Sequence, residues 1–319
     1  MVREEDLRMA ELPKRTLGRT GMDVTTLGYG AMELRGAPRG REVSDEQASR
    51  ILNAVLDSGI NFIDTSIDYG VAEERIGKFI SHRRDEFFLA SKCGCLAGDL
   101  VNNPPPAREG QRFPHVFTAQ NVRQGVEQSL ARMKTDHLDL VQFHSSPSMA
   151  EMQKDGGLQE LQKLQSEGKV RFIGVSGTIP NLKEQIESGI FDAFQIPYSA
   201  MQREHEMLIE QASQAGAGII IRGGAARGGP GKEEGEFWET WQRVGIDDLL
   251  GGMSRMEFIL RFTYSHPDLD TTIVGTINPD HLQDNINALT KGPLSNEVYQ
   301  EAKRRLAEAG QGPMAIPAV

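Results

Sequence analysis

Four polar residues stand at or just beyond the ends of short apolar runs, and their types fit one kind of proton chemistry. Asp64 lies in the run NFIDTS and Tyr69 follows it, while Lys92 ends EFFLASK. His144 ends LDLVQFH. A phenol is a reluctant acid at neutral pH, but a nearby ammonium stabilises the phenolate, and a carboxylate keeps that ammonium charged and in place. A histidine can hydrogen-bond a substrate oxygen or share a proton with the phenol. Such a group could protonate a carbonyl oxygen while hydride arrives at the carbon.

The elements that must position these side chains alternate between short apolar runs and amphipathic helical runs. Ser44 and Gln47 form a capping pattern at the start of the first long helix. Strands are predicted at 25–32, 61–66, 86–92, 138–144, 171–176, 192–197, 218–223 and 271–276. Helices are predicted at 44–59, 72–80, 118–134, 157–166, 180–188, 203–214, 253–265 and 279–289.

This alternation predicts an α/β fold in which eight strand–helix units close into a (β/α)8 TIM barrel. A doubly wound open sheet is the main competitor, but the first strand lacks the Gly-rich turn of that fold. In a barrel the four polar side chains meet at the rim where the strands end.

Four segments lie outside the alternation within what we predict to be one domain spanning 1–319. Residues 12–25 are predicted to form an N-terminal hairpin, and 308–319 a loose tail. Residues 93–117 and 223–250 are predicted to be long loops after the third and seventh strands, where barrels place active sites.

Composition excludes several classes of protein. The 319 residues include 35 Lys and Arg against 45 Asp and Glu, a formal net charge of −10. Such a chain has no general electrostatic attraction for nucleic acid or an anionic membrane. The first residues, MVREEDLRMAELPKR, lack the apolar core of a signal peptide, and no run is apolar enough to span a membrane. We therefore expect a cytoplasmic protein that acts on a small molecule. The oligomeric state of the protein stays open.

Metal and disulfide chemistry are not expected. The two cysteines, Cys93 and Cys95, are too closely spaced for the usual redox or zinc pair and are predicted to be reduced thiols. A metal-dependent hydrolase would need clustered ligands at strand ends. Of the seven histidines, only His144 falls at a predicted inner strand end.

From Arg15 to about Leu289 the sequence resembles the aldo-keto reductase family. The resemblance rests on RTLGRTGMDVTTLGYGAM, GINFIDTSIDYG with EERIGKFI, LASKCG, LDLVQFH, KVRFIGVSG and FDAFQIPYSAMQRE. It implies a (β/α)8 barrel with an N-terminal hairpin and NADPH-dependent reduction of an aldehyde or ketone. The implied catalytic tetrad is Asp64, Tyr69, Lys92 and His144.

The resemblance also implies a mechanism, in which the nicotinamide delivers hydride to the carbonyl carbon. Tyr69 donates the proton to oxygen, and Lys92, paired with Asp64, lowers the pKa of the tyrosine. His144 orients the carbonyl.

The resemblance further implies a cofactor site, with Ser176 and Gln195 on the nicotinamide carboxamide. The implied cofactor-binding residues are Gly30, Ala31, Met32, Asp64, Ser176, Gly177, Gln195, Arg222, Gly223, Gly224, Ala226, Arg227, Gly275, Thr276, His281 and Asn285.

Several positions depart from the family pattern. Gly177 replaces an asparagine, and Arg222 stands where an aromatic residue usually stacks on the nicotinamide. Arg222 could stack there, reach the pyrophosphate or a substrate carboxylate, or point to solvent. Gly275 and His281 replace basic residues near the adenosine phosphate, which weakens discrimination for a 2′-phosphate. We expect NADPH as the preferred cofactor, with NADH plausible.

Three further questions stay open at this stage. The chain could be a cofactor-binding redox sensor or regulatory subunit, or a lyase-like enzyme that retains its cofactor while acting on a sugar-type substrate. The two long loops carry five aromatic residues that could line an apolar pocket: Phe113, Phe117, Phe237, Trp238 and Trp241. Alternatively, Phe237, Trp238 and Trp241 could belong to a short helix packed on the barrel. Arg108, Arg112, Arg222 and Arg227 are possible anion contacts.

Overall fold

Eight parallel strands form a closed barrel in this computed structural model, which describes residues 11–107, 113–224 and 235–315. The last strand pairs with the first, Thr272 opposite Leu27, so the predicted barrel is confirmed and an open sheet is wrong. Around the barrel the strands are β3 (Leu27–Gly30), β4 (Phe62–Asp64), β5 (Phe88–Cys93), β6 (Leu138–Phe143), β7 (Val170–Ser176), β8 (Ala193–Pro197), β9 (Gly218–Arg222) and β10 (Thr271–Val274).

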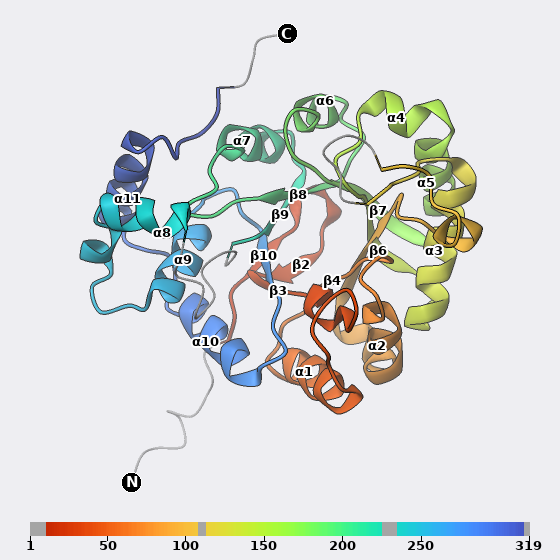
Figure 1. The fold of residues 1–319 in the computed structure, drawn as a ribbon, viewed down its shortest axis with the longest axis horizontal. Helices are drawn as coiled ribbons and strands as arrows, with labels where there is room; N and C mark the ends of the chain where they lie inside the picture. Colours follow the sequence, from red (N-terminus) through yellow and green to blue (C-terminus); the bar gives the residue numbers. More distant parts are fainter. Residues whose placement is uncertain (1–10, 108–112, 225–234, 316–319) are drawn as a thin grey trace.

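Helices surround the strands (Figure 1). Those at the predicted places are α1 (Asp45–Asp57), α2 (Ala72–Phe79), α3 (Ala119–Met133), α5 (Gly157–Ser166), α6 (Leu182–Glu187), α7 (Glu206–Gln214), α9 (Arg255–Tyr264) and α10 (Pro279–Thr290). Three more are α4 (Met149–Lys154), α8 (Glu236–Arg243) and α11 (Asn296–Glu308). The predicted capping box is present at α1, where Ser44 and Gln47 satisfy each other's backbone N–H groups.

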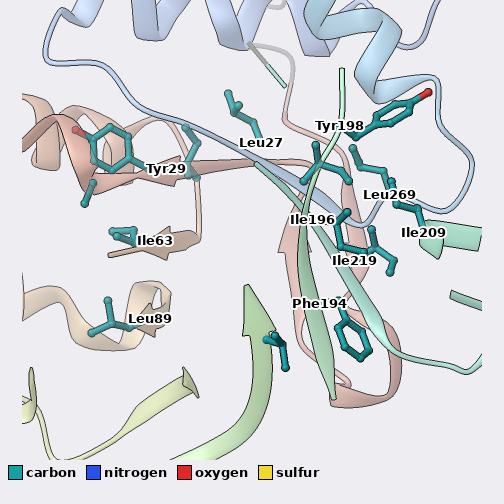
Figure 2. Packing of buried hydrophobic residues seen from close by; sticks show 14 of the residues in the cluster. Leu27, Tyr29, Ile63, Leu89, Phe194, Ile196, Tyr198, Ile209, Ile219 and Leu269 are labelled. Atoms are coloured by element: carbon teal, nitrogen blue, oxygen red, sulfur yellow. The ribbon is translucent and has the colours of Figure 1, made fainter. Parts of the chain in front are cut away.

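The main apolar core lies between the outer face of the barrel and the helices. Because side chains alternate along a strand, every second residue faces this layer. Figure 2 shows Ile63, Leu89 and Ile219 among them, and each is buried.

Inside the barrel, the alternate residues form two layers of opposite character. The lower layer is apolar and fully buried: Phe62, Ala90, Leu140, Ala193 and Ile220. The upper layer comes two residues later on the same strands and is polar: Asp64, Lys92, Gln142, Gln195 and Arg222. The upper layer faces the carboxyl ends of the strands, where barrels carry their chemistry.

The predicted N-terminal hairpin closes the barrel below the lower layer. Its strands β1 (Lys14–Thr16) and β2 (Asp23–Thr25) pair antiparallel. Leu17, Met22 and Val24 join the same apolar cluster as the lower layer. The turn lies so close to β9 that a Cβ at Gly18 would be 2.2 Å from the backbone nitrogen of Gly218. Only glycine fits at this crossing.

The segment 223–250 is not one continuous loop. It contains α8, where the side chains of Trp238 and Trp241 are buried and the Trp241 indole donates to Asp247 at 2.7 Å. The helix interpretation is thus confirmed for these two tryptophans, and a pocket role for them is wrong. The Phe237 side chain lies outside the described part, as do Arg108, Arg112, Ala226 and Arg227.

The segment after α11 makes two contacts with the β8–α7 loop. An Arg203 guanidinium nitrogen donates to the Gln311 carbonyl at 3.3 Å, and the Met314 N–H donates to the Glu204 carbonyl at 3.2 Å.

In the described part of the chain, no helix combines the length and apolar character needed to cross a membrane.

Candidate active site

A buried ion pair forms the centre of the upper layer. The Lys92 ammonium lies 2.6 Å from Asp64 Oδ1 and donates to the Thr65 carbonyl at 2.7 Å. Gln142 and Gln195 donate to the other oxygen of Asp64 at 3.0 and 2.8 Å. Since a buried charge is costly unless it is paired and hydrogen-bonded, this set of contacts holds the ion pair in one position.

Tyr69 lies directly beside this pair, in the turn after β4. The Lys92 ammonium is 4.9 Å from the centre of the phenol ring. Burial raises the pKa of Tyr69, while Lys92 acts to lower it and Asp64 to raise it. Lys92 therefore acts on the pKa of Tyr69 in the expected direction, and burial, the larger effect, leaves this pKa raised overall. The phenol is protonated at neutral pH.

His144 approaches the phenol edge-on from the end of β6, with ring centres 6.3 Å apart. Burial lowers the pKa of His144, Asp68 opposes this, and Lys92 adds to it. The imidazole is therefore neutral at physiological pH. Its Nδ1 atom lies 3.1 Å from Cys95 Sγ and 3.4 Å from His115 Nε2.

A cavity of about 860 Å³ opens above these side chains. Of the residues predicted from the sequence, it is lined by Gly30, Met32, Asp64, Tyr69, Phe113, His144, Ser176, Gln195, Arg222, Gly223 and Gly275. Predicted residues that do not line it are Ala31, Lys92, Phe117, Gly177, Gly224, Thr276, His281 and Asn285. Lys92 lies beneath the phenol instead, which is where a positioning charge belongs.

The structure at the end of β7 explains why Gly177 stands where the family pattern has an asparagine. Ser176 donates to the Gln195 side chain at 3.1 Å, so this serine, the glutamine and Asp64 form one chain of hydrogen bonds. A Cβ at Gly177 would lie 2.9 Å from Gln185 Oε1 and 3.0 Å from Leu182. A longer side chain there would crowd α6.

The turn from β10 to α10 explains why Gly275 stands where the family pattern has a basic residue. A Cβ at Gly275 would be 2.6 Å from the Gly30 carbonyl oxygen, so no side chain fits without a backbone shift. Asn278 caps α10 by accepting from the Asp280 N–H at 3.0 Å. His281 is exposed on the first turn, and Asn285 is buried one turn later.

Arg222 extends into the cavity from the end of β9. Its guanidinium makes no hydrogen bond or ion pair with the described residues, and its Nε atom is buried. Burial lowers its pKa, while Tyr69 and Asp64 act to raise it. A partly buried cation whose Nε atom has no partner is costly, so this position favours an electron-rich ligand.

Sequence reasoning missed several residues at this rim, among them Gln142, Ser145, His115, Asp68 and Cys95. Gln142 could have been found, because it precedes His144 by two on the same strand and so faces the barrel interior. Ser145, with a backbone φ of 65°, is brought to His115 at 3.2 Å by an unusual turn, and Asp68 and Cys95 also approach through loops. Loops carry no period that would predict such contacts.

Comparison with known proteins gives consistent results. Residues 26–234 match the family model described as Aldo/keto reductase family. The aldo-keto reductase YhdN of Bacillus subtilis is 31% identical over 313 residues, covering 88% of this chain and 90% of that protein. L-galactose dehydrogenase of Arabidopsis thaliana is 24% identical over 307 residues, covering 89% of this chain and 90% of that protein. A solved aldo-keto reductase of Bacillus halodurans, in its holo form, superposes with a TM-score of 0.78 at 25% identity, over 92% of this chain and 96% of that one.

Proposed function

Because the chain belongs to the aldo/keto reductase family, and is thus an NAD(P)H-dependent oxidoreductase acting on a carbonyl group, we propose that Tyr69, Lys92 and His144 perform its chemistry. The observation that carries this proposal is the buried contact beneath the phenol. Lys92 sits 2.6 Å from Asp64 and 4.9 Å from the centre of the Tyr69 ring. A subunit that only reports cofactor state has no use for such a proton donor.

The cavity carries features that fit a nicotinamide nucleotide. Gly30 and Gly275 form an edge without side chains, where a Cβ on Gly275 would lie 2.6 Å from the Gly30 carbonyl oxygen. Arg222 offers a cation without an ion pair among the described residues, and the nucleotide carries phosphates and an amide. The cavity volume of about 860 Å³ is within the range of cofactor sites. When bound, NAD(P)H supplies the hydride.

The protein supplies the proton. Tyr69, kept protonated by burial, donates it to the carbonyl oxygen as negative charge develops there. Lys92 stabilises the phenolate that is left, and Asp64 fixes the ammonium in place. His144 is neutral and engages its loop partners through Nδ1, which leaves Nε2 for the substrate oxygen. Gln195, Ser176 and Asp64 line the same wall, and we assign the first two to the nicotinamide amide.

The finer cofactor preference is for NADPH, with NADH as a close competitor. The first turn of α10 offers backbone N–H groups and the exposed imidazole of His281 to a 2′-phosphate. Asp280 in the same turn opposes it. We expect a Michaelis constant several-fold lower for NADPH than for NADH. Equal constants would contradict the preference.

The substrate class we propose is a hydroxylated aldehyde or ketone, of the sugar type. The outer wall of the cavity is rich in hydroxyl and amide groups, including Ser145, Ser146, Thr178 and Asn181. These suit a substrate with several hydroxyls better than an alkyl aldehyde. The resemblance to L-galactose dehydrogenase supports the same class.

The test is carbonyl-dependent oxidation of NADPH and NADH, followed by the absorbance of the reduced nicotinamide. The panel contains hydroxylated aldehydes and ketones beside alkyl aldehydes of matched length. A higher kcat/KM for the hydroxylated members supports the proposal. Cofactor binding without oxidation by any carbonyl would favour the sensor instead. A single domain over 1–319 and a cytoplasmic location stay predictions.

A further inference from the structure

A cluster of four metal-ligating side chains gathers around Nδ1 of His144, whose ring meets the Tyr69 phenol edge-on. It consists of Asp68, Cys95, His115 and His144, and we name it the Cys–His cluster. One ligand atom from each residue lies within 4.8 Å of every other. The activity proposed above uses only His144 of this set, so the other three residues have no assigned role.

The distances from His144 Nδ1 are close to those in the ligand shell of a small thiophilic cation. His144 Nδ1 is 3.1 Å from Cys95 Sγ, 3.4 Å from His115 Nε2 and 3.8 Å from Asp68 Oδ1. Around tetrahedral Zn²⁺, with bonds of about 2.0–2.3 Å, neighbouring ligand atoms are about 3.3–3.8 Å apart. The three distances from Nδ1 are therefore within a few tenths of an ångström of such a shell. The remaining pairs of ligand atoms, which lie within 4.8 Å of each other, would close by up to about 1 Å on binding.

Three separate loops hold these ligands in place. The Cys95 carbonyl accepts from the Asn121 side chain at 2.9 Å, so its loop is anchored to α3. Asp68 accepts from Ser66 through the same oxygen that faces the imidazole, at 2.6 Å. His115 stacks on Phe117, with ring centres 6.4 Å apart. Such anchoring lowers the ordering cost of binding an ion.

We propose that the Cys–His cluster is a Zn²⁺ site, and that filling it blocks carbonyl reduction. The chemistry of the ligands selects the ion, since one thiolate, two imidazoles and one carboxylate are typical of zinc and poor for Mg²⁺ or Ca²⁺. On binding, Cys95 releases its proton to solvent and its thiolate becomes a ligand. Four protein ligands leave no open position, so the ion holds structure and does not activate water.

Inhibition follows from the shared ligand and rests on the function proposed above. His144 would be fixed to the ion through Nδ1, which ties the orientation of its ring to the metal. Asp68 and His115 line the same cavity and would close around the ion. The substrate oxygen would then lose its orienting imidazole.

The sequence offers a matched control two residues away. Cys93 is the last residue of β5, and its thiol is buried in the main apolar core. Gly94, with φ of 86°, turns the chain between the two thiols, so the C-G-C segment does not bind an ion through both cysteines. This agrees with the spacing, which is too short for the usual zinc pair. Of the two thiols, that of Cys95 contacts the His144 ring.

Binding is tested with Co²⁺ as the probe, on the full chain without cofactor. One equivalent should give the near-ultraviolet thiolate-to-cobalt absorption band and visible bands of a four-coordinate ion. Cys95→Ser should lose the thiolate band, while Cys93→Ala should keep it. His115→Asn, which leaves both thiols, should weaken cobalt and zinc binding more than tenfold. No band in the wild type, or a band that survives in Cys95→Ser, would overturn the site.

Inhibition is tested by titrating Zn²⁺ into the carbonyl assay. Wild type and Cys93→Ala should be inhibited, and a chelator should restore their activity. Cys95→Ser should need at least tenfold more Zn²⁺ for half-inhibition. Cobalt binding with undiminished activity would overturn the inhibitory role alone. A protein inactive toward every carbonyl would defeat the proposed function, while the cobalt spectra would still decide the metal site.

Discussion

The two layers inside the barrel come from the same strands, two residues apart, and have opposite tasks. The lower layer, with Leu140 on β6, is apolar, fully buried and closed by the hairpin. The upper layer, with Gln142 on the same strand, carries an ion pair and its hydrogen bonds beneath an open cavity. The strand period alone separates a region that stabilises the fold from one that holds charge for chemistry.

The two layers also differ in how burial changes the free energy of folding. The lower layer gains free energy by removing apolar surface from water. The upper layer buries Lys92 and Asp64, whose desolvation is offset only while both partners and their hydrogen bonds remain. Substitutions in the lower layer should therefore change stability, and those in the upper layer should change activity as well.

Tyr69→Phe should give the largest effect and test the upper layer directly. Removing the phenol hydroxyl leaves the carbonyl oxygen without its acid, and general acid catalysis contributes about 100- to 10,000-fold. We expect kcat to fall by that factor while the dissociation constant of NADPH, measured by fluorescence, stays unchanged. Activity near the wild-type value would make His144 the next candidate for the acid.

Lys92→Met should reduce both activity and stability, because it leaves Asp64 buried and unpaired. Breaking a buried pair costs about 3–5 kcal/mol of unfolding free energy. The double variant Asp64→Asn with Lys92→Met removes both charges and should recover much of the stability but none of the activity. Denaturant unfolding and turnover are measured on the same samples. Recovery of activity in the double variant would contradict a role for the ammonium.

Leu140→Ala is the matched substitution in the lower layer. Truncating a fully buried leucine costs about 2–5 kcal/mol. Because the side chain does not line the cavity, kcat/KM at a temperature well below unfolding should stay within about twofold. A large loss of kcat/KM with little change in stability would break the division between the layers.

The smallest effect concerns acid stability. Burial lowers the pKa of His144 below its unfolded value of 6.5, so below that pH the unfolded chain binds a proton that the folded chain does not. The stability is complete above pH 6.5 and is lost as the pH falls below it, by at most about 1.4 kcal/mol per pH unit for this group. Thermal unfolding from pH 7.5 to 5 should show a smaller loss for His144→Asn than for wild type. Leu140→Ala should keep the wild-type slope, and an equal slope in all three would show that other groups dominate.

The sequence predicted the positions of site residues that lie on the regularly repeating strands. The period of the strands placed Asp64, Lys92 and His144 at one rim, and the structure brings the three within one site. The contacts of Cys95 and His115 could not be predicted, because loops place them across intervals of the chain that have no pattern. The net pKa of Tyr69 was also beyond the sequence, since burial depends on the finished packing.

The hairpin below the lower layer has a consequence for synthesis of the chain. Arg19 donates to the carbonyl of Ala215, a partner 196 residues further along. At about 5–20 residues per second, a ribosome needs about 10–40 s to reach that partner. Leu17, Met22 and Val24 must remain exposed, or be sheltered by another protein, for all of that time. This segment, translated early, is thus among the last to dock, and its waiting period is the interval in which aggregation competes most strongly with folding.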